Sequence, residues 1–307
     1  MLVKEKDNRL FLSHGPIDIV LEAFGKDKSL AYKKAKNYFI TLLDELVLDM
    51  DLLKEEVVPN RKFNNKISQS MQNATEKFYP DFITPMAAVA GSVADNILNV
   101  LIEGSDLEKA YVNNGGDVSF YLTENQTVKS NLASIPNIIA EINYKDKSRG
   151  IATSGWKGRS FSLGIADSVT VLANNAAMAD AAATMIANSV DIKDHPLIIK
   201  KPASDIYEDS DLKDLMVTVK VGDLKQSDIE VALKNGNEVG KKYLEKGLIN
   251  SALIELHNCF CIVQKQTKTN GASHRRGSAK GGRCWWWGRG RGIHAAIEYP
   301  RIQSASL

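Results

Sequence analysis

The sequence is poor in cysteine: the 307 residues include three cysteines, and all of them follow residue 258. So few thiols, gathered near one end, do not provide the disulfide framework of a small secreted protein and fit a reducing compartment. The first eight residues, MLVKEKDN, are charged and lack the apolar centre of a signal peptide. We therefore expect a cytoplasmic protein.

Long uninterrupted apolar runs are also missing. The two most apolar stretches, 83–102 and 163–190, are interrupted by Asp95 and by Asp167 and Asp180 respectively. Carboxylates in the middle of a segment make a membrane span costly. We therefore expect no membrane partner for this chain.

Positive charge is scarce outside the C-terminal part. The formal net charge is +2, but nine Lys and Arg lie from residue 257 onward against a single acid, Glu298. The rest of the chain holds 30 basic and 36 acidic residues. A mildly acidic body has no electrostatic footprint for nucleic acid, so we expect no nucleic-acid partner for the folded part.

Hydrophobic residues make up 44% of the chain, which is enough for a large core. Apolar residues alternate, as in strands, over the stretches 9–20, 109–122, 136–144, 150–154, 167–173, 215–221 and 248–256. They recur at helical spacing over 29–57, 84–104, 175–190 and 227–247, the last introduced by a capping box at Ser227. The pattern predicts an α+β (α/β) fold of one principal domain, with mixed or antiparallel sheets and packed helices.

The segment 148–190 is dense in glycines and hydroxyl groups. Glycine allows the backbone to approach a ligand closely, and Ser and Thr hydroxyls both donate and accept hydrogen bonds. The residues concerned are Thr153, Ser154, Gly155, Gly158, Ser160, Ser162 and Gly164. Their combination favours a bound anion.

Asp180 and Thr184 lie four residues apart in the Ala-rich segment expected to be helical. This spacing places both oxygen-bearing side chains on one helix face, one turn apart. A hard cation accepts such ligands, and a carboxylate among alanines requires a partner. The sequence therefore predicts a metal site at these two residues.

Pieces of the chain, in order, resemble the ApbE superfamily, known for flavin transferases that use FAD to attach FMN to a protein Ser or Thr. They are a glycine-containing helix followed by an aspartate (86–95), an Asn-x-Gly-Gly-Asp turn (113–117), Thr-Ser-Gly (153–155), and Val-Thr-Val leading to Ala-Asp-x-x-Ala-Thr (169–184). The span to about residue 256 looks closest to the uncharacterised ApbE-related proteins, which share the pieces SGxxGRSxSLGIAD and PASDIYEDSDLKD. The resemblance implies an ApbE-like fold.

The same resemblance implies FAD or FMN and Mg²⁺ as cofactors. It assigns Mg²⁺ to Asp180 and Thr184. It assigns the nucleotide pocket to the Gly-rich turn and the Ser-Gly strand end, that is to Asn113, Gly115, Gly116, Asp117, Ser154 and Gly155. Gly-rich turns hold phosphates through backbone N–H groups, which agrees with this assignment. We add Thr153 and Arg159 as further candidate ligand-binding residues.

The chain also departs from the transferases. It lacks their His-x-Ile-Asp-Pro-x-Thr-Gly segment before Val-Thr-Val, and Gly91-Ser92 stands where they have Lys-Gly. Lys157 and Arg159 either replace the missing charge or form an exposed loop pair. Phosphoryl-type transfer depends on such charges, so the sequence leaves catalysis open while nucleotide binding remains an expectation.

Three functions are compatible with these residues. The first is Mg²⁺-dependent chemistry on a flavin or other nucleotide, as in an FMN transferase or a relative of it. The second is a non-catalytic module that binds a flavin-like or phosphorylated ligand. The third is a different small-molecule enzyme on the same scaffold, since a fold does not fix a function. A homo-oligomer is compatible with all three.

The composition divides the chain into an ApbE-like domain (1–257) and a basic tail rich in Gly, Arg and Trp (258–307). The tail composition either stacks on and neutralises nucleic acid or reflects a shifted reading frame or an added extension. Its cysteines and histidines do not follow zinc-site spacing. We expect this tail, including Trp285 to Trp287, to be disordered or poorly packed.

Overall fold

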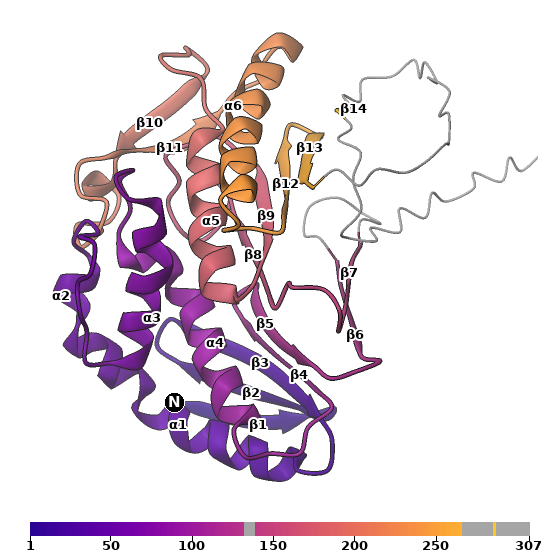
Figure 1. Cartoon of the computed structure of the whole chain (residues 1–307). Coiled ribbons are helices and arrows are strands. Elements are labelled where there is room, and N and C mark those ends of the chain that lie inside the picture. Colours follow the sequence, from indigo (N-terminus) through magenta and orange to yellow (C-terminus); the bar gives the residue numbers. More distant parts are fainter. Residues whose placement is uncertain (132–138, 266–284, 287–307) are drawn as a thin grey trace, which may run out of the picture.

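The computed structural model describes residues 1–131 and 139–265 and the backbone of residues 285–286 (Figure 1). In this part of the chain, ten strands form one sheet in the order β1-β2-β3-β4-β5-β8-β9-β12-β13-β14. Neighbouring strands from β1 to β13 are antiparallel, and β14 pairs in parallel with β13. The pairs β6-β7 and β10-β11 form two smaller antiparallel sheets.

The bounds of the elements follow the chain. The strands are β1 (Leu2–Lys6), β2 (Arg9–His14), β3 (Ile17–Phe24), β4 (Lys109–Asn114), β5 (Asp117–Leu122), β6 (Thr127–Asn131), β7 (Ile139–Asn143), β8 (Gly150–Ser154), β9 (Ser168–Ala173), β10 (Ile198–Pro202), β11 (Met216–Val221), β12 (Ser251–Leu256), β13 (Cys259–Gln264) and β14 (Trp285–Trp286). The helices are α1 (Lys28–Leu48), α2 (Met50–Leu53), α3 (Lys66–Thr75), α4 (Val89–Ile102), α5 (Ala176–Ser189) and α6 (Gln226–Glu245), with short 3-10 helices η1 (Glu76–Phe78), η2 (Pro85–Ala88) and η3 (Ala203–Asp205).

The fold class predicted from the sequence is confirmed as mixed α and β structure with mostly antiparallel sheets. Two predicted hairpins are present. The turn at Gly15 and Pro16 joins β2 to β3, and the turn at Gly115 and Gly116 joins β4 to β5. Both glycines of the second turn have positive φ, 64° and 120°, a conformation that most side chains disfavour.

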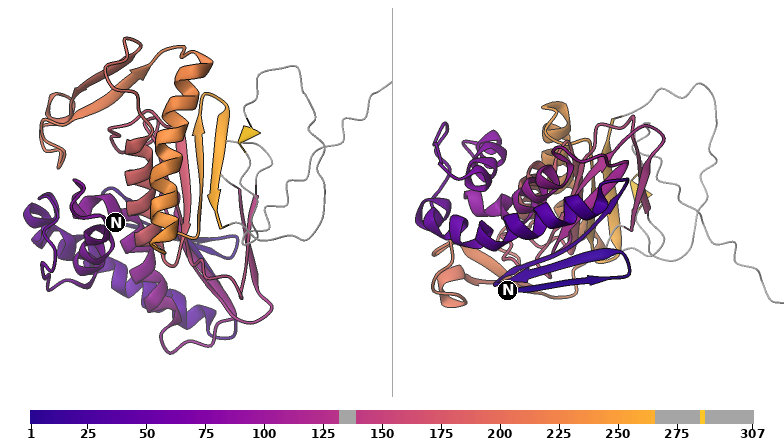
Figure 2. Two further views of the ribbon diagram at one scale, coloured as in Figure 1. Left: turned by 45° about the horizontal axis from the view of Figure 1, so that its top comes forward. Right: turned by 90° about the horizontal axis from the view of Figure 1, so that it is seen from below.

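Helices and a hairpin cover opposite faces of the large sheet. Helices α1, α4, α5 and α6 lie on one side, and the β6-β7 hairpin lies on the other (Figures 1 and 2). The main core fills the helical side, while a smaller cluster around Phe120 and Leu172 lies under the hairpin. The sheet is therefore buried on both faces near its centre, as the fully buried strand β9 shows.

Helices α4 and α5 approach each other closely at Gly91. A Cβ atom at this position would lie 2.3 Å from the carbonyl oxygen of Ala176, so only glycine fits there. Gly91-Ser92 stands where the transferases have Lys-Gly, and the packing of α4 against α5 requires the glycine in this chain. The close crossing fixes the start of α5 beside α4.

Asp95 on α4 also fixes the first turn of α5. Its carboxylate accepts hydrogen bonds from the N–H groups of Ala176 (3.0 Å) and Ala177 (2.8 Å) and from the hydroxyl of Ser119 (2.5 Å). The first N–H groups of a helix have no partner within the helix, so a carboxylate there satisfies them. Burial raises the pKa of Asp95, and the three donors act in the opposite direction. The position of α5 relative to α4 and β5 is therefore well defined.

Several elements lie where little or no regular structure was predicted, among them β1, α3, β6, β10 and β13. Helix α3 lies within the polar stretch 60–79, which has no clear hydrophobic period. It begins after Asn65, whose side chain accepts hydrogen bonds from the N–H groups of Ile67 (2.7 Å) and Ser68 (3.2 Å). This cap and the buried residues Ile67 and Met71 hold the helix on the core.

The predicted capping box at Ser227 is wrong. Helix α6 has Lys225 as its N-cap, without a side-chain cap hydrogen bond, and Ser227 lies within the first turn. The hydroxyl of Ser227 donates to Asp228 instead, at 3.3 Å. The helix is stabilised by the packing of its apolar face, including Ile229 and Leu233, rather than by a cap.

Residues 259–264, which the sequence assigned to the tail, form β13 and pair with β12 along its whole length. Cys259 and Cys261 are buried there, so the folded body continues beyond residue 257. The expectation of a disordered tail falls on residues 266–284 and 287–307, which lie outside the described part. The backbone of residues 285–286 forms β14.

Among the described residues, Pro85–Ile102 is long and apolar enough to cross a membrane by length and composition alone. A core helix of a soluble protein passes the same test, and half of this segment is buried inside the structure. Val93, Ile97 and Leu101 of α4 are fully buried in the main core. The segment is accounted for as a core helix.

Candidate functional site

A cavity of about 990 Å³ lies between the helical layer and one end of the large sheet. Its walls come from α1, α2, η2, α4 and α5, from the ends of β3, β4, β5 and β8, from short segments at Pro16 and 82–84, and from two longer loops. The loops are 155–163, after β8, and 206–212, before β11. A volume of this size suits a small-molecule ligand.

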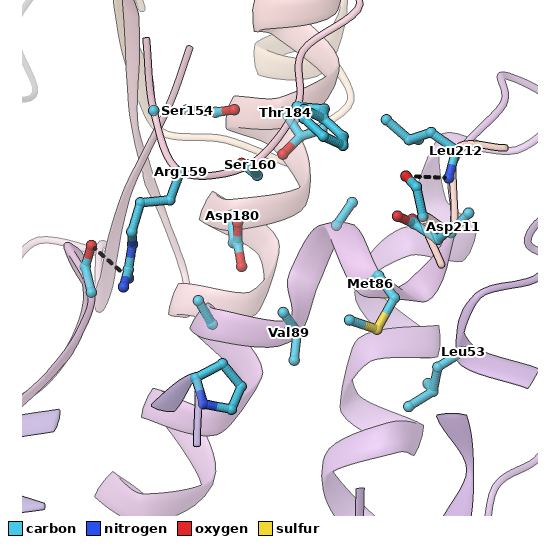
Figure 3. Close-up of a pocket in the computed structure, with 18 of the residues that line it drawn as sticks. Leu53, Met86, Val89, Ser154, Arg159, Ser160, Asp180, Thr184, Asp211 and Leu212 are labelled. Atoms are coloured by element: carbon cyan, nitrogen blue, oxygen red, sulfur yellow. Dashed lines mark hydrogen bonds between the residues drawn. The ribbon is translucent and has the colours of Figure 1, made fainter. Parts of the chain in front are cut away.

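Two carboxyl groups, those of Asp117 and Asp180, meet in this cavity. Asp117 begins β5 and accepts a hydrogen bond from the N–H of Thr153 at 3.3 Å. Asp180 lies on α5 and accepts a hydrogen bond from the N–H of Gly91 at 3.0 Å. The two carboxyl groups lie close enough for each to shift the pKa of the other. Figure 3 shows Asp180 projecting from its helix toward the space between the walls.

The position of Asp117 follows from a break in the sheet. Strands β5 and β8 pair at only two positions, Val118 with Ile151 and Ser119 with Gly150. Beyond these pairs the carboxylate of Asp117 accepts a hydrogen bond from the N–H of Thr153. Strands β5 and β8 therefore separate beside α5, and the space between their ends leads into the cavity.

Burial raises the pKa of Asp117 to about 7, against the smaller lowering effects of the Thr153 N–H, Asp180 and Arg159. Burial also raises the pKa of Asp180 well above its usual value, and the neighbouring Asp117 charge adds to this effect. Two carboxylates in contact cannot both ionise easily in a poorly solvated place. Near pH 7 the pair therefore retains a proton.

Thr184 lines the same cavity one turn beyond Asp180, on the same helix (Figure 3). The two residues predicted to bind a metal are therefore neighbours on the cavity wall. In the part of the chain that the structure describes, there is no group of three or more His, Cys, Asp or Glu that could hold a metal ion. A cation here would have two carboxylates, hydroxyl groups, water and ligand atoms as its donors.

Arg159 contributes positive charge at the edge of the cavity. Its side chain is exposed, and Nη2 donates to the carbonyl oxygen of Gly115 at 3.5 Å. A Cβ atom at Gly115 would lie 1.8 Å from that nitrogen, so glycine makes room for the guanidinium. Lys157, the other candidate for replacement charge, pairs with Asp167 at 2.8 Å and is not part of the cavity wall.

The structure separates the other predicted ligand-binding residues into two sets. Thr153, Ser154 and Gly155 line the cavity together with Gly115 and Asp117. Asn113 and Gly116 do not line it.

These two residues form the β4-β5 turn, where the N–H of Gly116 donates to Oδ1 of Asn113 at 2.8 Å. Gly155 also has a packing role, since a Cβ there would lie 2.4 Å from the carbonyl oxygen of Asp167.

Several cavity residues were not predicted. Asn114 lies beside the turn and donates from Nδ2 to the carbonyl oxygen of Ala90 at 3.1 Å, which links β4 to α4. Leu53, Met86 and Val89 form an apolar wall (Figure 3). Nothing in their local sequence distinguishes them from ordinary core residues, because their position depends on how α2 and α4 pack.

Loop 206–212 was noted in the sequence only as part of the shared PASDIYEDSDLKD piece, and the structure places it at the cavity. Asp211 accepts a hydrogen bond from the hydroxyl of Thr84, and Asp209 forms an ion pair with Lys54 at 2.5 Å. Both contacts join the loop to the segment between α2 and α4. Asp209 and Asp211 are therefore held against the cavity wall that Lys54 and Thr84 help to form.

Comparisons with known proteins give the family of the chain. A family model described as AbpE bacteria matches residues 1–269. A UPF0280 protein of Methanopyrus kandleri is 31% identical over 175 residues, which cover 56% of this chain and 69% of the relative. A UPF0280 protein of Methanococcus maripaludis strain C7 is 36% identical over 174 residues, which cover 53% of this chain and 68% of the relative.

Other relatives match over a shorter part. A UPF0280 protein of Methanococcus maripaludis strain C6 is 42% identical over 113 residues, which cover 34% of this chain and 45% of the relative. The chain thus spans less than half of that relative, and about half of the relative from Methanothrix thermoacetophila, at 52%. The names of these proteins state no activity, substrate or cofactor.

These comparisons correct the expected relationship to the FMN transferases of the ApbE superfamily. The relatives named above are UPF0280 proteins, and none of them bears the name of a flavin transferase. Neither a transferase activity nor a flavin nucleotide is supported, so FAD and FMN are not carried forward. The chain is similar to the UPF0280 proteins and belongs to the family described as AbpE bacteria.

Proposed function

We propose that this protein binds a small molecule through a hard divalent cation of the Mg²⁺ type held by Asp117 and Asp180. The observation that carries the proposal is the contact between these two carboxyl groups on the wall of a large cavity. Such a pair is unfavourable without a positive partner. A divalent cation in place of the shared proton would relieve the repulsion.

The donor set fits Mg²⁺ better than a metal held by protein groups alone. Mg²⁺ usually takes one or two carboxylates and completes its shell with water and ligand oxygens. Asp117 and Asp180 supply the carboxylates, and the hydroxyl of Thr184 lies one helical turn away. The remaining positions would be open to water and to the ligand.

The charges around the cavity favour a cation as the first occupant. Asp18, Asp117 and Asp180 line it, and Arg159 stands at its edge. A bare anion would meet this acidic wall, whereas an anion that binds through a divalent cation would not. We place the small molecule's negatively charged group between the cation and Arg159. Within this proposal the protein acts in the cytoplasm, and neither a membrane nor a nucleic acid takes part.

The test is isothermal titration calorimetry with MnCl₂ and MgCl₂ on the full chain. We expect the wild type to bind Mn²⁺, and Asp180→Asn to weaken this binding by about tenfold or more, because an amide is a poorer ligand than a carboxylate. Protons compete for the same oxygens, so affinity should rise from about pH 6 to about pH 8. Circular dichroism would verify that the variant is folded.

Asp228→Asn is the matched control. Asp228 lies on α6, is partly exposed and pairs with His195 at 3.3 Å, outside the cavity wall. This variant should bind Mn²⁺ as the wild type does. If Asp180→Asn binds Mn²⁺ as tightly as the wild type, or if the wild type binds none at any pH, the cation proposal is refuted and the pair is an acid that shares one proton.

A further inference from the structure

The cavity has two chemically different ends. At one end Asp117, Asp180 and Arg159 are gathered with the Ser and Thr hydroxyls. At the other end Leu53, Met86 and Val89 line the wall, and the polar side chains of that end, among them Thr84 and Asp211, are paired with each other. Figure 3 shows Leu53 and Met86 across the cavity from Arg159, with Val89 between them and Asp180. A ligand that reaches across the cavity would meet both.

Three elements, α2, η2 and α4, contribute the apolar side chains of this end. Leu53 comes from α2 and is fully buried, while Met86 of η2 and Val89 of α4 are half-buried and face the cavity. Half-buried apolar side chains around a hollow leave hydrophobic surface in contact with water, which is unfavourable. An apolar group of a ligand would remove that surface from water.

Loop 206–212 encloses this end. The ion pair between Lys54 and Asp209 and the hydrogen bond from Thr84 to Asp211 fasten it to the segments that also carry Leu53 and Met86. Leu212 of the loop lies on the cavity wall near Asp211 (Figure 3). The loop therefore forms one side of this apolar end, which we call the apolar chamber.

The size of the cavity supports the same conclusion. Its volume is about 990 Å³, whereas a water molecule occupies about 30 Å³ in the liquid. A cation with its waters and one small anion would fill only a fraction of the cavity. Cavities of about 300 to 1,000 Å³ typically take ligands with a substantial apolar part.

We infer that the ligand is an amphipathic anion: a negatively charged head directed to the carboxyl pair, and an apolar ring or chain packed against Met86 and Val89. The placement of the head rests on the proposed function. The placement of the apolar body rests on the opposite wall and is tested separately. A purely polar compound would leave the apolar side chains of this chamber in contact with water.

The experiment uses the dye 1-anilinonaphthalene-8-sulfonate, an aromatic anion whose fluorescence rises in an apolar environment, with and without MnCl₂. We expect the dye to bind the wild type. Met86→Gln keeps the length of the side chain and replaces its apolar end, so it should weaken dye binding by about tenfold. The matched control is Met216→Gln on β11, where the methionine is 48% exposed and lies outside the cavity wall; it should leave dye binding unchanged.

Two readouts keep this inference apart from the cation proposal. Met86→Gln should bind Mn²⁺ as the wild type does, and the wild type should bind the dye in the absence of metal. Equal dye affinity in the wild type and Met86→Gln, or an equal loss in Met216→Gln, overturns the apolar chamber. If the wild type binds the dye but does not bind Mn²⁺, only the cation proposal is overturned.

Discussion

Gly91→Ala should destabilise the protein, although helix propensity alone predicts the reverse. Gly91 lies inside α4, where a change from Gly to Ala normally stabilises a helix by about 1 kcal/mol. Here the new Cβ would lie 2.3 Å from the carbonyl oxygen of Ala176. A normal contact requires a separation of about 1 Å more, and overpacking of this kind costs about 1–3 kcal/mol.

The neighbour of Gly91 cannot move aside easily. The clash is with backbone, and the N–H of Ala176 is tied to Asp95 at 3.0 Å. A shift of α4 would also lengthen the hydrogen bond from the N–H of Gly91 to Asp180. We therefore expect the cost of the clash to exceed the gain in propensity, with a net loss of up to about 2 kcal/mol in the free energy of unfolding.

Urea unfolding followed by circular dichroism measures this loss. Gly240→Ala in α6 is the control, because the Cβ there would meet a side-chain methyl of Val263, at 2.9 Å, which can shift. We expect the control to change the free energy of unfolding by less than Gly91→Ala does. If Gly91→Ala is as stable as the wild type, or if both variants lose equally, the proposed rigidity of the α4–α5 crossing is wrong.

Two further predictions concern the buried carboxylates. Burial raises the pKa of Asp117 from its ordinary value of 3.8 to about 7. The folded state therefore binds more protons than the unfolded state between these pH values, and stability falls as pH rises through this range. The stability of Asp117→Asn relative to the wild type should therefore grow by a few kcal/mol between about pH 4 and about pH 7 in urea titrations; a constant difference would contradict the raised pKa. Asp95→Ala removes the acceptor for Ala176, Ala177 and Ser119 and should lower the free energy of unfolding by at least about 2 kcal/mol, whereas Ser119→Ala, which removes one of the three bonds, should cost less.

Local patterns were sufficient to predict much of the fold. Helical spacing of apolar residues predicted the segments that became α1, α4, α5 and α6, and Gly-containing turns predicted the β2-β3 and β4-β5 hairpins. Such features depend on residues within a few positions of one another. Strand β13 shows the limit of this reasoning. Cys259, Cys261 and Val263 alternate as a half-buried strand should, yet the change in composition beyond them led to their assignment to a tail.

The sequence alone determined that Asp180 and Thr184 share a helix face, since a spacing of four residues fixes this in any α-helix. It could not determine that Asp117 would be the partner of Asp180. That contact requires β5 to separate from β8 after two residue pairs, and α5 to be fixed by Asp95 and Gly91.

The apolar chamber likewise exists only because α2, η2 and loop 206–212 converge from distant parts of the chain. Contacts of this kind depend on how whole elements pack, and no local spacing in the sequence encodes them.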